Sequence, residues 1–198
     1  MSLFLSPNST MLATFYLLLT YLVGSFPTGH VLATLYADVD VTSHGSGNIG
    51  ATNVTRLLGK GMGVLTLVGD MAKGAVPVLL ASFVSDSSLF PGLVALAAFS
   101  GHCWSAYMEF RGGKGVATAG GVMLALAPFA TVLVAIVWIG VLITWKKASL
   151  ASLVSVAVLP VLLLLFNPGV TWIGLLLGAG VAWRHQPNIR RLLRGTEV

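Results

Sequence analysis

Long apolar stretches separated by short polar segments dominate this sequence and limit the folds open to it. Residues 148–166, for example, contain no charged side chain. Across all 198 residues only 9% are charged and 56% are hydrophobic, whereas a soluble domain carries about 25% charged residues. A chain with so few charges cannot cover a water-exposed surface with them. The sequence therefore predicts an integral membrane protein of the all-α class, with several helices that cross the bilayer.

Six stretches are candidates for these crossings, because a helix needs about 20 apolar residues to cross the hydrocarbon core. They are Met11–Tyr36, Gly61–Val84, Leu89–Met108, Val116–Trp145, Ala148–Phe166 and Val170–Trp183. The first is interrupted by Gly24 and Pro27. The fourth is long for one span and short for two. Its Ala127-Pro128 break predicts two helices, a short one before Pro128 and a longer one after it.

The distribution of basic residues decides how often the chain crosses the membrane. If Val116–Trp145 is a hairpin of two helices, there are seven spans, and every Lys and Arg outside the spans lies on one side. If it is a single span, Lys146 and Lys147 fall on the outside together with the C-terminal arginines. The positive-inside rule favours the first arrangement. We therefore expect one domain over residues 1–198, with an outer N-terminal tail over 1–10 and a cytoplasmic C-terminal segment over 185–198.

With this topology three polar segments share the cytoplasmic face: Ser43–Arg56, Arg111–Thr118 and His185–Glu197. In the first, residues 46–53 read Ser-Gly-Asn-Ile-Gly-Ala-Thr-Asn. Small residues expose backbone N–H groups, and a helix that starts after Gly50 would turn its first N–H groups toward an anion. The same residue types are common in ordinary turns. The pattern alone leaves phosphate binding and a plain loop equally open.

The second and third segments also have two interpretations. The run Arg-Gly-Gly-Lys-Gly at 111–115 is not a P-loop, because Lys114 is not followed by Ser or Thr and no strand precedes it. A cytoplasmic anchor would explain Arg111 and Lys114 but not the small residues around them. In the third segment, a basic helix on anionic lipid explains the arginines. His185 and Asn188 are three residues apart and could face one ligand together.

The remaining polar residues of the spans favour structural roles. Asp70 and Lys73 are three residues apart within one span, which favours a structural ion pair over catalysis. His102 and Cys103 are adjacent and so do not share a helix face, which makes Cys103 a packing residue. His30 has no partner that the sequence reveals. No cluster has metal-ligand spacing, so neither a metal nor another cofactor is expected.

Taken together, the three segments resemble the bacterial acyl-phosphate-dependent glycerol-3-phosphate acyltransferases of the PlsY type. The resemblance rests on residues 46–53 with Arg56, on Gly101-His102 with residues 110–118, and on His185, Asn188-Ile189, Arg191-Leu192 and Gly195-Thr196-Glu197. It extends from about Gly24 to Glu197. One departure is that Ser105 and Tyr107 stand where the family usually has Pro and Phe.

The resemblance implies that a fatty acyl group passes from acyl phosphate to the 1-hydroxyl of glycerol 3-phosphate, giving lysophosphatidic acid and phosphate, the first step of phospholipid synthesis. It implies a monomeric, multi-pass protein of the bacterial inner membrane that contacts membrane lipid, has its active site on the cytoplasmic side and binds no nucleic acid. The implied catalytic residues are Ser46, Arg56, Lys114, His185 and Asn188. The implied substrate-binding residues are Gly47, Asn48, Gly50, Thr52, Asn53, His102, Arg111, Gly112, Gly113, Gly115 and Thr118.

The route of the reacting proton stays open between a histidine and the substrate. His185 is the first candidate for a general base and His102 the second. However, acyl phosphate has a good leaving group, and its own phosphate can accept the hydroxyl proton, which we favour. The glycine-loop N–H groups would hold the acyl phosphate or its developing oxyanion. An acyl-enzyme is not expected, because no Ser or Cys has an activating triad.

Two other functions fit the residues less well. Acyltransferases that use acyl-CoA or acyl-carrier protein through a His-x4-Asp motif are disfavoured, because none of the four histidines is followed by Asp at that spacing. A small transporter of a phosphate-bearing solute would also have spans and phosphate loops. It should show internal repeats and binding groups near the membrane midplane, whereas this chain has no visible repeat and its polar groups lie at one face.

Overall fold

The computed structural model describes residues 7–197, and this part of the chain is helical with no strand. Its α-helices are α1 (Pro7–Ser25), α2 (Thr28–Ala37), α3 (Ala51–Leu58), α4 (Lys60–Leu80), α5 (Phe90–Cys103), α6 (Val116–Leu126), α7 (Pro128–Trp145), α8 (Ala148–Phe166), α9 (Thr171–Arg184) and α10 (Gln186–Leu193). Short 3-10 turns follow α4, α5 and α8. The predicted all-α class is confirmed.

The predicted interruption near Pro27 separates α1 from α2, whose axes differ by 41°. Proline has no N–H to donate, and it disfavours the helical conformation of the residue before it. The break leaves the carbonyl of Phe26 without its usual helical partner. The ammonium group of Lys73 donates a hydrogen bond to that carbonyl at 2.7 Å. A buried cation of α4 thus stabilises the break in the first apolar stretch.

The long stretch 116–145 consists of two helices, as its Ala127-Pro128 pair predicts. Ala127 is extended, with φ −147° and ψ 67°, and Pro128 opens α7 at a position where its missing N–H costs nothing. The first helix, α6, has 11 residues and is about 16 Å long at the helical rise. A helix this short needs protein around its ends at membrane depth.

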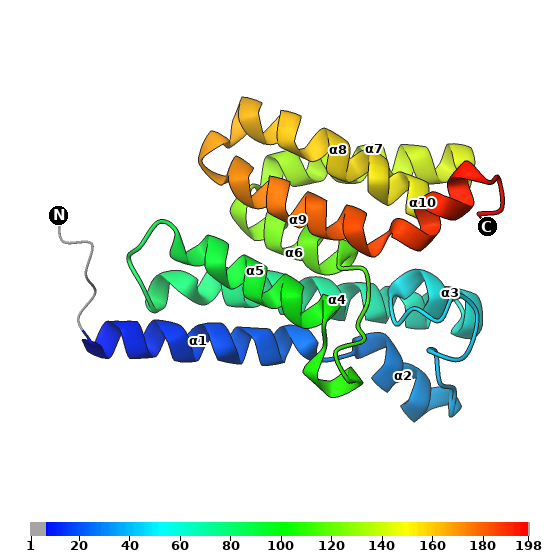
Figure 1. Cartoon of the computed structure of the whole chain (residues 1–198), viewed down its shortest axis with the longest axis horizontal. Coiled ribbons are helices and arrows are strands. Elements are labelled where there is room, and N and C mark those ends of the chain that lie inside the picture. The colour runs from blue at the N-terminus through cyan, green and yellow to red at the C-terminus, as the bar shows by residue number, and fades with distance from the viewer. Residues whose placement is uncertain (1–6, 198) are drawn as a thin grey trace.

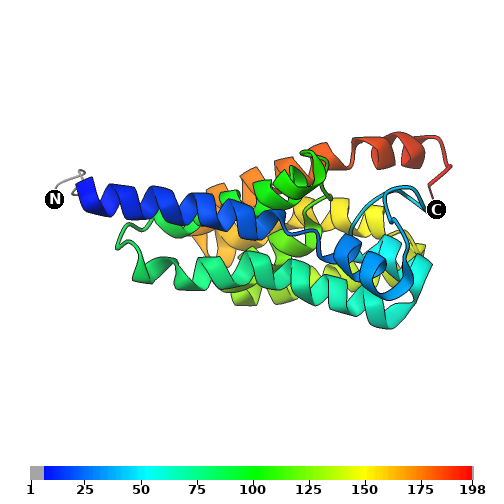
Figure 2. The same cartoon turned by 90° about the horizontal axis from the view of Figure 1, so that it is seen from below.

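Seven helices lie side by side and alternate in direction, so that successive ends fall at opposite ends of the bundle (Figure 1): α1, α4, α5, the short α6, α7, α8 and α9. In both views α2, α3 and α10 lie at the end opposite the N-terminus (Figure 2). Within residues 7–197, three helices are long and apolar enough to cross a membrane, or four if α1 and α2 form one bent span. The seven-span count therefore stays a prediction.

Close packing between helices depends on glycine at their contacts. A methyl group at Gly74 of α4 would collide with the backbone oxygen of Thr118 in the first turn of α6. One at Gly121 of α6 would collide with the backbone oxygen of Met71. Gly24 of α1 meets the backbone of α5 in the same way. These contacts set the approach of α4 to α6 and of α1 to α5. The candidate site lies at the C-terminal end of α5 and the start of α6.

Candidate active site

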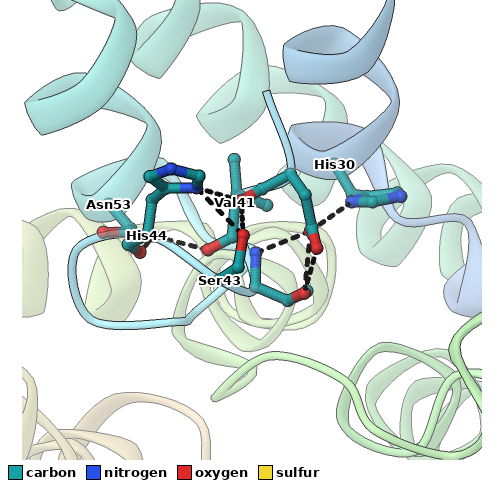
Figure 3. Close-up of polar contacts among 7 residues, drawn as sticks. His30, Val41, Ser43, His44 and Asn53 are labelled. Atoms are coloured by element: carbon teal, nitrogen blue, oxygen red, sulfur yellow. Dashed lines mark hydrogen bonds and ion pairs between the residues drawn. The ribbon is translucent and has the colours of Figure 1, made fainter. Parts of the chain in front are cut away.

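The loop before α3 is organised around the buried side chain of Asn53, which is 1% exposed. Its carbonyl oxygen accepts a hydrogen bond from the N–H of Ser46 at 2.9 Å. Its amide group donates to the backbone oxygens of Val41 and His44, each at 3.1 Å (Figure 3). Asn53 therefore holds the loop from inside, and its amide is not free to contact a ligand as the sequence suggested.

Other members of this segment face outward. Ser46, Gly47, Thr52 and Arg56 are exposed. Gly47 has φ +67°, a left-handed conformation that only glycine adopts readily. The loop thus presents hydroxyl groups and one guanidinium group at the surface.

Two further turns complete this loop. The side chain of Asn48 accepts from the N–H of Gly50 at 2.9 Å, and Gly50 caps α3 in an extended conformation. The predicted helix start after Gly50 is confirmed.

Asp40 lies close to two histidines, His30 of α2 and His44 of this loop. The N–H of Thr42 donates to its carboxylate at 2.9 Å, and His30 Nδ1 lies 3.6 Å from the same oxygen. His44 Nδ1 lies 2.9 Å from the backbone oxygen of Asp40 (Figure 3). Hydrogen bonds from Thr42 lower the pKa of Asp40. Both histidines therefore serve the local structure of the loop.

The glycine loop lies against the C-terminal end of α5. The N–H of Gly112 donates to the oxygen of Cys103 at 3.2 Å, and that of Gly113 donates to the oxygen of His102 at 3.0 Å. Any side chain at either glycine would collide with α5 or with the imidazole of His102. Both N–H groups thus already donate to α5, and the assignment of Gly112 and Gly113 as substrate-binding residues stays a prediction.

The start of α6 offers the N–H groups that the glycines do not. Gly115 precedes this helix with φ +79°, packed against Phe99 and Cys103. The first N–H groups of a helix have no partner within it and favour an anion. Lys114 stands directly before this turn. Thr118 is buried in it, and its hydroxyl has no hydrogen-bond partner among the described residues.

Arg184, at the end of α9, is the residue that sequence reasoning missed. Its Nε donates to the oxygen of Gly113 at 2.9 Å, and its Nη2 donates to the oxygen of Gly112 at 2.7 Å. The guanidinium also lies 5.9 Å from the ring centroid of Trp104. In the sequence, Arg184 is one of the C-terminal arginines and counts only as a cytoplasmic charge. Its position next to His185 was the one available signal.

Behind the glycine loop lies a buried polar cluster. Lys73 Nζ is 2.9 Å from Asp70 Oδ1, which confirms the predicted ion pair. His102 Nδ1 is 3.7 Å from the same oxygen, and His102 is 3% exposed. His102 therefore supports the loop from inside. Cys103 is buried, as a packing residue should be. Within residues 7–197 no three acidic, His or Cys side chains gather as a metal site would require.

The C-terminal segment brings its two predicted residues together inside the protein. His185 and Asn188 are 2% and 4% exposed. His185 Nδ1 lies 2.8 Å from the backbone oxygen of Val181, and Asn188 Nδ2 donates to Glu197 at 2.6 Å. Burial, opposed by the Val181 hydrogen bond, lowers the pKa of His185 to about 4. The ring is therefore neutral at physiological pH.

Charged groups from the three polar segments act on one another. Burial, together with the charges of Arg191, Arg56 and Arg184, lowers the pKa of Lys114 to about 8 against the opposing charge of Glu197. These arginines belong to α10, α3 and α9. One ammonium group and three guanidinium groups thus converge near the start of α6, with Glu197 as a nearby carboxylate. Arg111 is exposed at the edge of the loop.

A helical bundle with apolar outer faces and a cationic cluster at one end defines an enzyme or a binding protein that handles anionic substrates at a membrane. The family model of glycerol-3-phosphate acyltransferases matches residues 14–195, and this chain belongs to that family. The glycerol-3-phosphate acyltransferase of Syntrophotalea carbinolica is 45% identical over 94% of this chain and 97% of its own length. That of Neisseria meningitidis is 44% identical, over 90% and 92%.

Two solved structures have the same fold. The crystal structure of PlsY, an integral membrane glycerol 3-phosphate acyltransferase, in its glycerol 3-phosphate form has a TM-score of 0.88 and 40% identity, over 94% of each chain. Its lysophosphatidic acid form has a TM-score of 0.86 and 41% identity, over the same share. The chain is thus an integral membrane acyltransferase that acts on glycerol 3-phosphate, as its three motifs predicted.

Proposed function

We propose that this enzyme transfers a fatty acyl group from acyl phosphate to the 1-hydroxyl of glycerol 3-phosphate. The observation that carries the proposal is the guanidinium of Arg184 bound to the carbonyl oxygens of Gly112 and Gly113, directly before Lys114 and the first turn of α6. The positive charges of Arg56 and Arg191 also act on Lys114. Both substrates are phosphate compounds, and each brings about two negative charges that such a cluster neutralises. The forms of PlsY with glycerol 3-phosphate and lysophosphatidic acid support the same acceptor and product here.

The proposed phosphate ligands differ in how they bind. Arg56 is exposed at the rim, where its planar guanidinium can bind two phosphate oxygens, whereas Lys114 acts as a point charge. Ser46 and Thr52 lie exposed on the same segment as Arg56 and add neutral hydroxyl donors. The N–H groups at the start of α6 complete a site for an anion or for the oxyanion that develops during transfer.

The reaction follows as one direct transfer. The 1-hydroxyl oxygen attacks the acyl carbonyl, the bond from that carbonyl to the phosphate oxygen breaks, and the released phosphate takes the hydroxyl proton. The products are lysophosphatidic acid and hydrogen phosphate, so atoms and charge balance. With its pKa lowered to about 4, His185 is a weak base, which favours the phosphate as proton acceptor. The thiol of Cys103 is buried and does not reach the substrates.

The membrane supplies the apolar part of the donor. Large apolar side chains are exposed on the outer helices, for example Ile136, Ile143 and Leu165, which are 60%, 71% and 68% exposed. A fatty acyl chain in the lipid can lie along such a surface while its phosphate reaches the cationic cluster. We propose that this cluster faces the cytoplasmic side of a bacterial inner membrane, which the positive-inside rule supports. We propose that one chain is sufficient for activity.

The test supplies the purified protein with one acyl donor at a time and measures lysophosphatidic acid formed from glycerol 3-phosphate. We expect product with acyl phosphate and none above background with acyl-CoA or acyl-carrier protein. Omitting glycerol 3-phosphate is the control for simple hydrolysis of the donor. Efficient transfer from acyl-CoA would contradict the proposed donor while leaving the acceptor intact.

A further inference from the structure

Glu197 is a buried carboxylate with three hydrogen-bond donors. It is 7% exposed. Its Oε1 accepts from the hydroxyl of Ser149 and from Nδ2 of Asn188, and its Oε2 accepts from Nε of Arg191, each at 2.6 Å. Although burial raises its pKa, these hydrogen bonds outweigh that effect and lower the pKa of Glu197. The carboxylate is therefore ionised and connects α8 with α10 near the site.

This carboxylate determines which way the amide of Asn188 points. An ionised carboxylate only accepts hydrogen bonds, so the group of Asn188 that faces Glu197 must be the NH2 group. The carbonyl oxygen Oδ1 then points elsewhere. Oδ1 is buried and has no hydrogen-bond partner among the described residues. An unsatisfied buried acceptor is costly, which indicates that a ligand donates to it.

His185 offers a second acceptor one helical turn away. Its Nδ1 lies 2.8 Å from a backbone oxygen, which can only accept, so Nδ1 carries the proton. In a neutral ring Nε2 is then an acceptor. Two acceptors repel phosphate oxygens and attract hydroxyl groups. Within the cationic cluster, Asn188 and His185 are therefore suited to the glycerol hydroxyls, while Lys114 and Arg56 are suited to the phosphate.

We propose that Glu197 is a positioning residue that orients Asn188 so that Oδ1 accepts a hydrogen bond from the 2-hydroxyl of glycerol 3-phosphate. The inference rests on the proposed function, because its test uses acyl phosphate as the acyl donor. The 2-hydroxyl keeps its proton throughout the reaction, and an amide oxygen can hold such a group without removing the proton. Glu197 thus selects for a vicinal diol without contacting it.

The test compares glycerol 3-phosphate with propane-1,3-diol monophosphate, which keeps the phosphate and the reacting hydroxyl but lacks the 2-hydroxyl. We expect the wild-type kcat/KM to fall by about 10-fold to 100-fold with this analogue, because the buried oxygen of Asn188 loses its donor. In Glu197→Ala we expect the two substrates to differ by less than about threefold, since the amide orientation is no longer fixed. Glu197→Gln can pair with Asn188 in either orientation and should be intermediate.

Asp86→Asn is the matched control, because it removes an exposed carboxylate in the turn between α4 and α5; it should keep the wild-type preference. Folding of each variant is checked through Cys103, the single cysteine, whose buried thiol reacts with a maleimide dye only on unfolding. A wild-type enzyme that uses both substrates equally, or a Glu197 variant that loses rate equally with both, would overturn the inference. Absence of any product from acyl phosphate in the wild type would instead refute the proposed function.

Discussion

Replacing Arg184 tests whether the glycine loop must be held from outside. The guanidinium donates to the carbonyl oxygens of Gly112 and Gly113, and the N–H groups of the same glycines donate to α5. The loop is thus bound on both sides. Arg184→Gln removes one side and a nearby positive charge. Arg184→Lys keeps the charge but cannot reproduce the planar two-bond geometry.

The magnitude follows from the two hydrogen bonds. A hydrogen bond to a charged partner contributes about 1.5–3 kcal/mol. Arg184 is partly exposed, so we take the lower value for each bond, about 3 kcal/mol in total. If the released loop is inactive, 3 kcal/mol corresponds to a loss of about 100-fold in kcat/KM. Both Arg184→Gln and Arg184→Lys should show a loss of this order.

The pH dependence separates the charge from the geometry. Lys114 has a pKa of about 8 in the free enzyme, partly because of the charge of Arg184. Above that pH the ammonium group loses its proton, so phosphate binding weakens and kcat/KM falls. In Arg184→Gln the pKa of Lys114 rises, and the alkaline limb of kcat/KM moves to higher pH. In Arg184→Lys the limb stays in place while the rate is still reduced.

The assay is lysophosphatidic acid formation by purified variants between pH 6 and 10 at saturating acyl phosphate, with hydrolysis of the donor measured separately. Thermal unfolding, followed through the thiol of Cys103, verifies that each variant is folded at the assay temperature. The reasoning would be refuted if folded Arg184→Gln had wild-type kcat/KM and an unchanged alkaline limb.

Three further predictions concern the site and the topology. Lys114→Ala and Arg56→Ala should each lose most activity while remaining folded, because either change removes a cation from the phosphate site. The expected loss is about 2–5 kcal/mol where the pair is desolvated. Near-wild-type turnover would mean that these residues only anchor the topology. Cys103→Ala should stay active, and a trapped thioester at this position would reinstate an acyl-enzyme. Single cysteines placed in that background at Lys147 and Arg194 should react with an impermeant maleimide from the cytoplasmic side alone, whereas outside labelling at Lys147 would contradict the seven-span topology.

The sequence was sufficient for those features that depend on local chemistry. Proline has no N–H and disfavours a helical conformation in the residue before it, so the boundaries at Pro27 and Pro128 could be predicted. The rule is not sufficient alone, because Pro77 and Pro160 lie inside α4 and α8 without ending them. The start of α3 after Gly50 followed from the same kind of argument. The three polar segments could be predicted to lie at one end of the bundle, because the distribution of basic residues indicates the side of the membrane on which a segment lies.

The roles of individual backbone groups could not be predicted in this way. Whether the N–H of Gly113 faces a ligand or α5 depends on how closely two segments approach, and nothing in the residue types shows it. The role of Asn53 could not be predicted for the same reason, because its amide is equally suited to hydrogen bonds with a substrate and with the loop backbone. Glu197 was recognised only as part of a motif, since its partners Ser149 and Asn188 are 48 and 9 residues away along the chain.

Through Gly74, the geometry of the site depends on helix packing deep in the bundle. This residue has no polar side chain of its own, yet its missing side chain is what allows the first turn of α6, with Thr118, to lie against α4. A library of substitutions would therefore show a line of intolerant positions that runs from the phosphate site along the α4–α6 contact through Gly74 and Gly121. Genetic screens that read such sensitivity as substrate contact would place the active site too far into the membrane. In this enzyme, the positions that the chain cannot change include those that keep two helices close as well as those that touch the substrate.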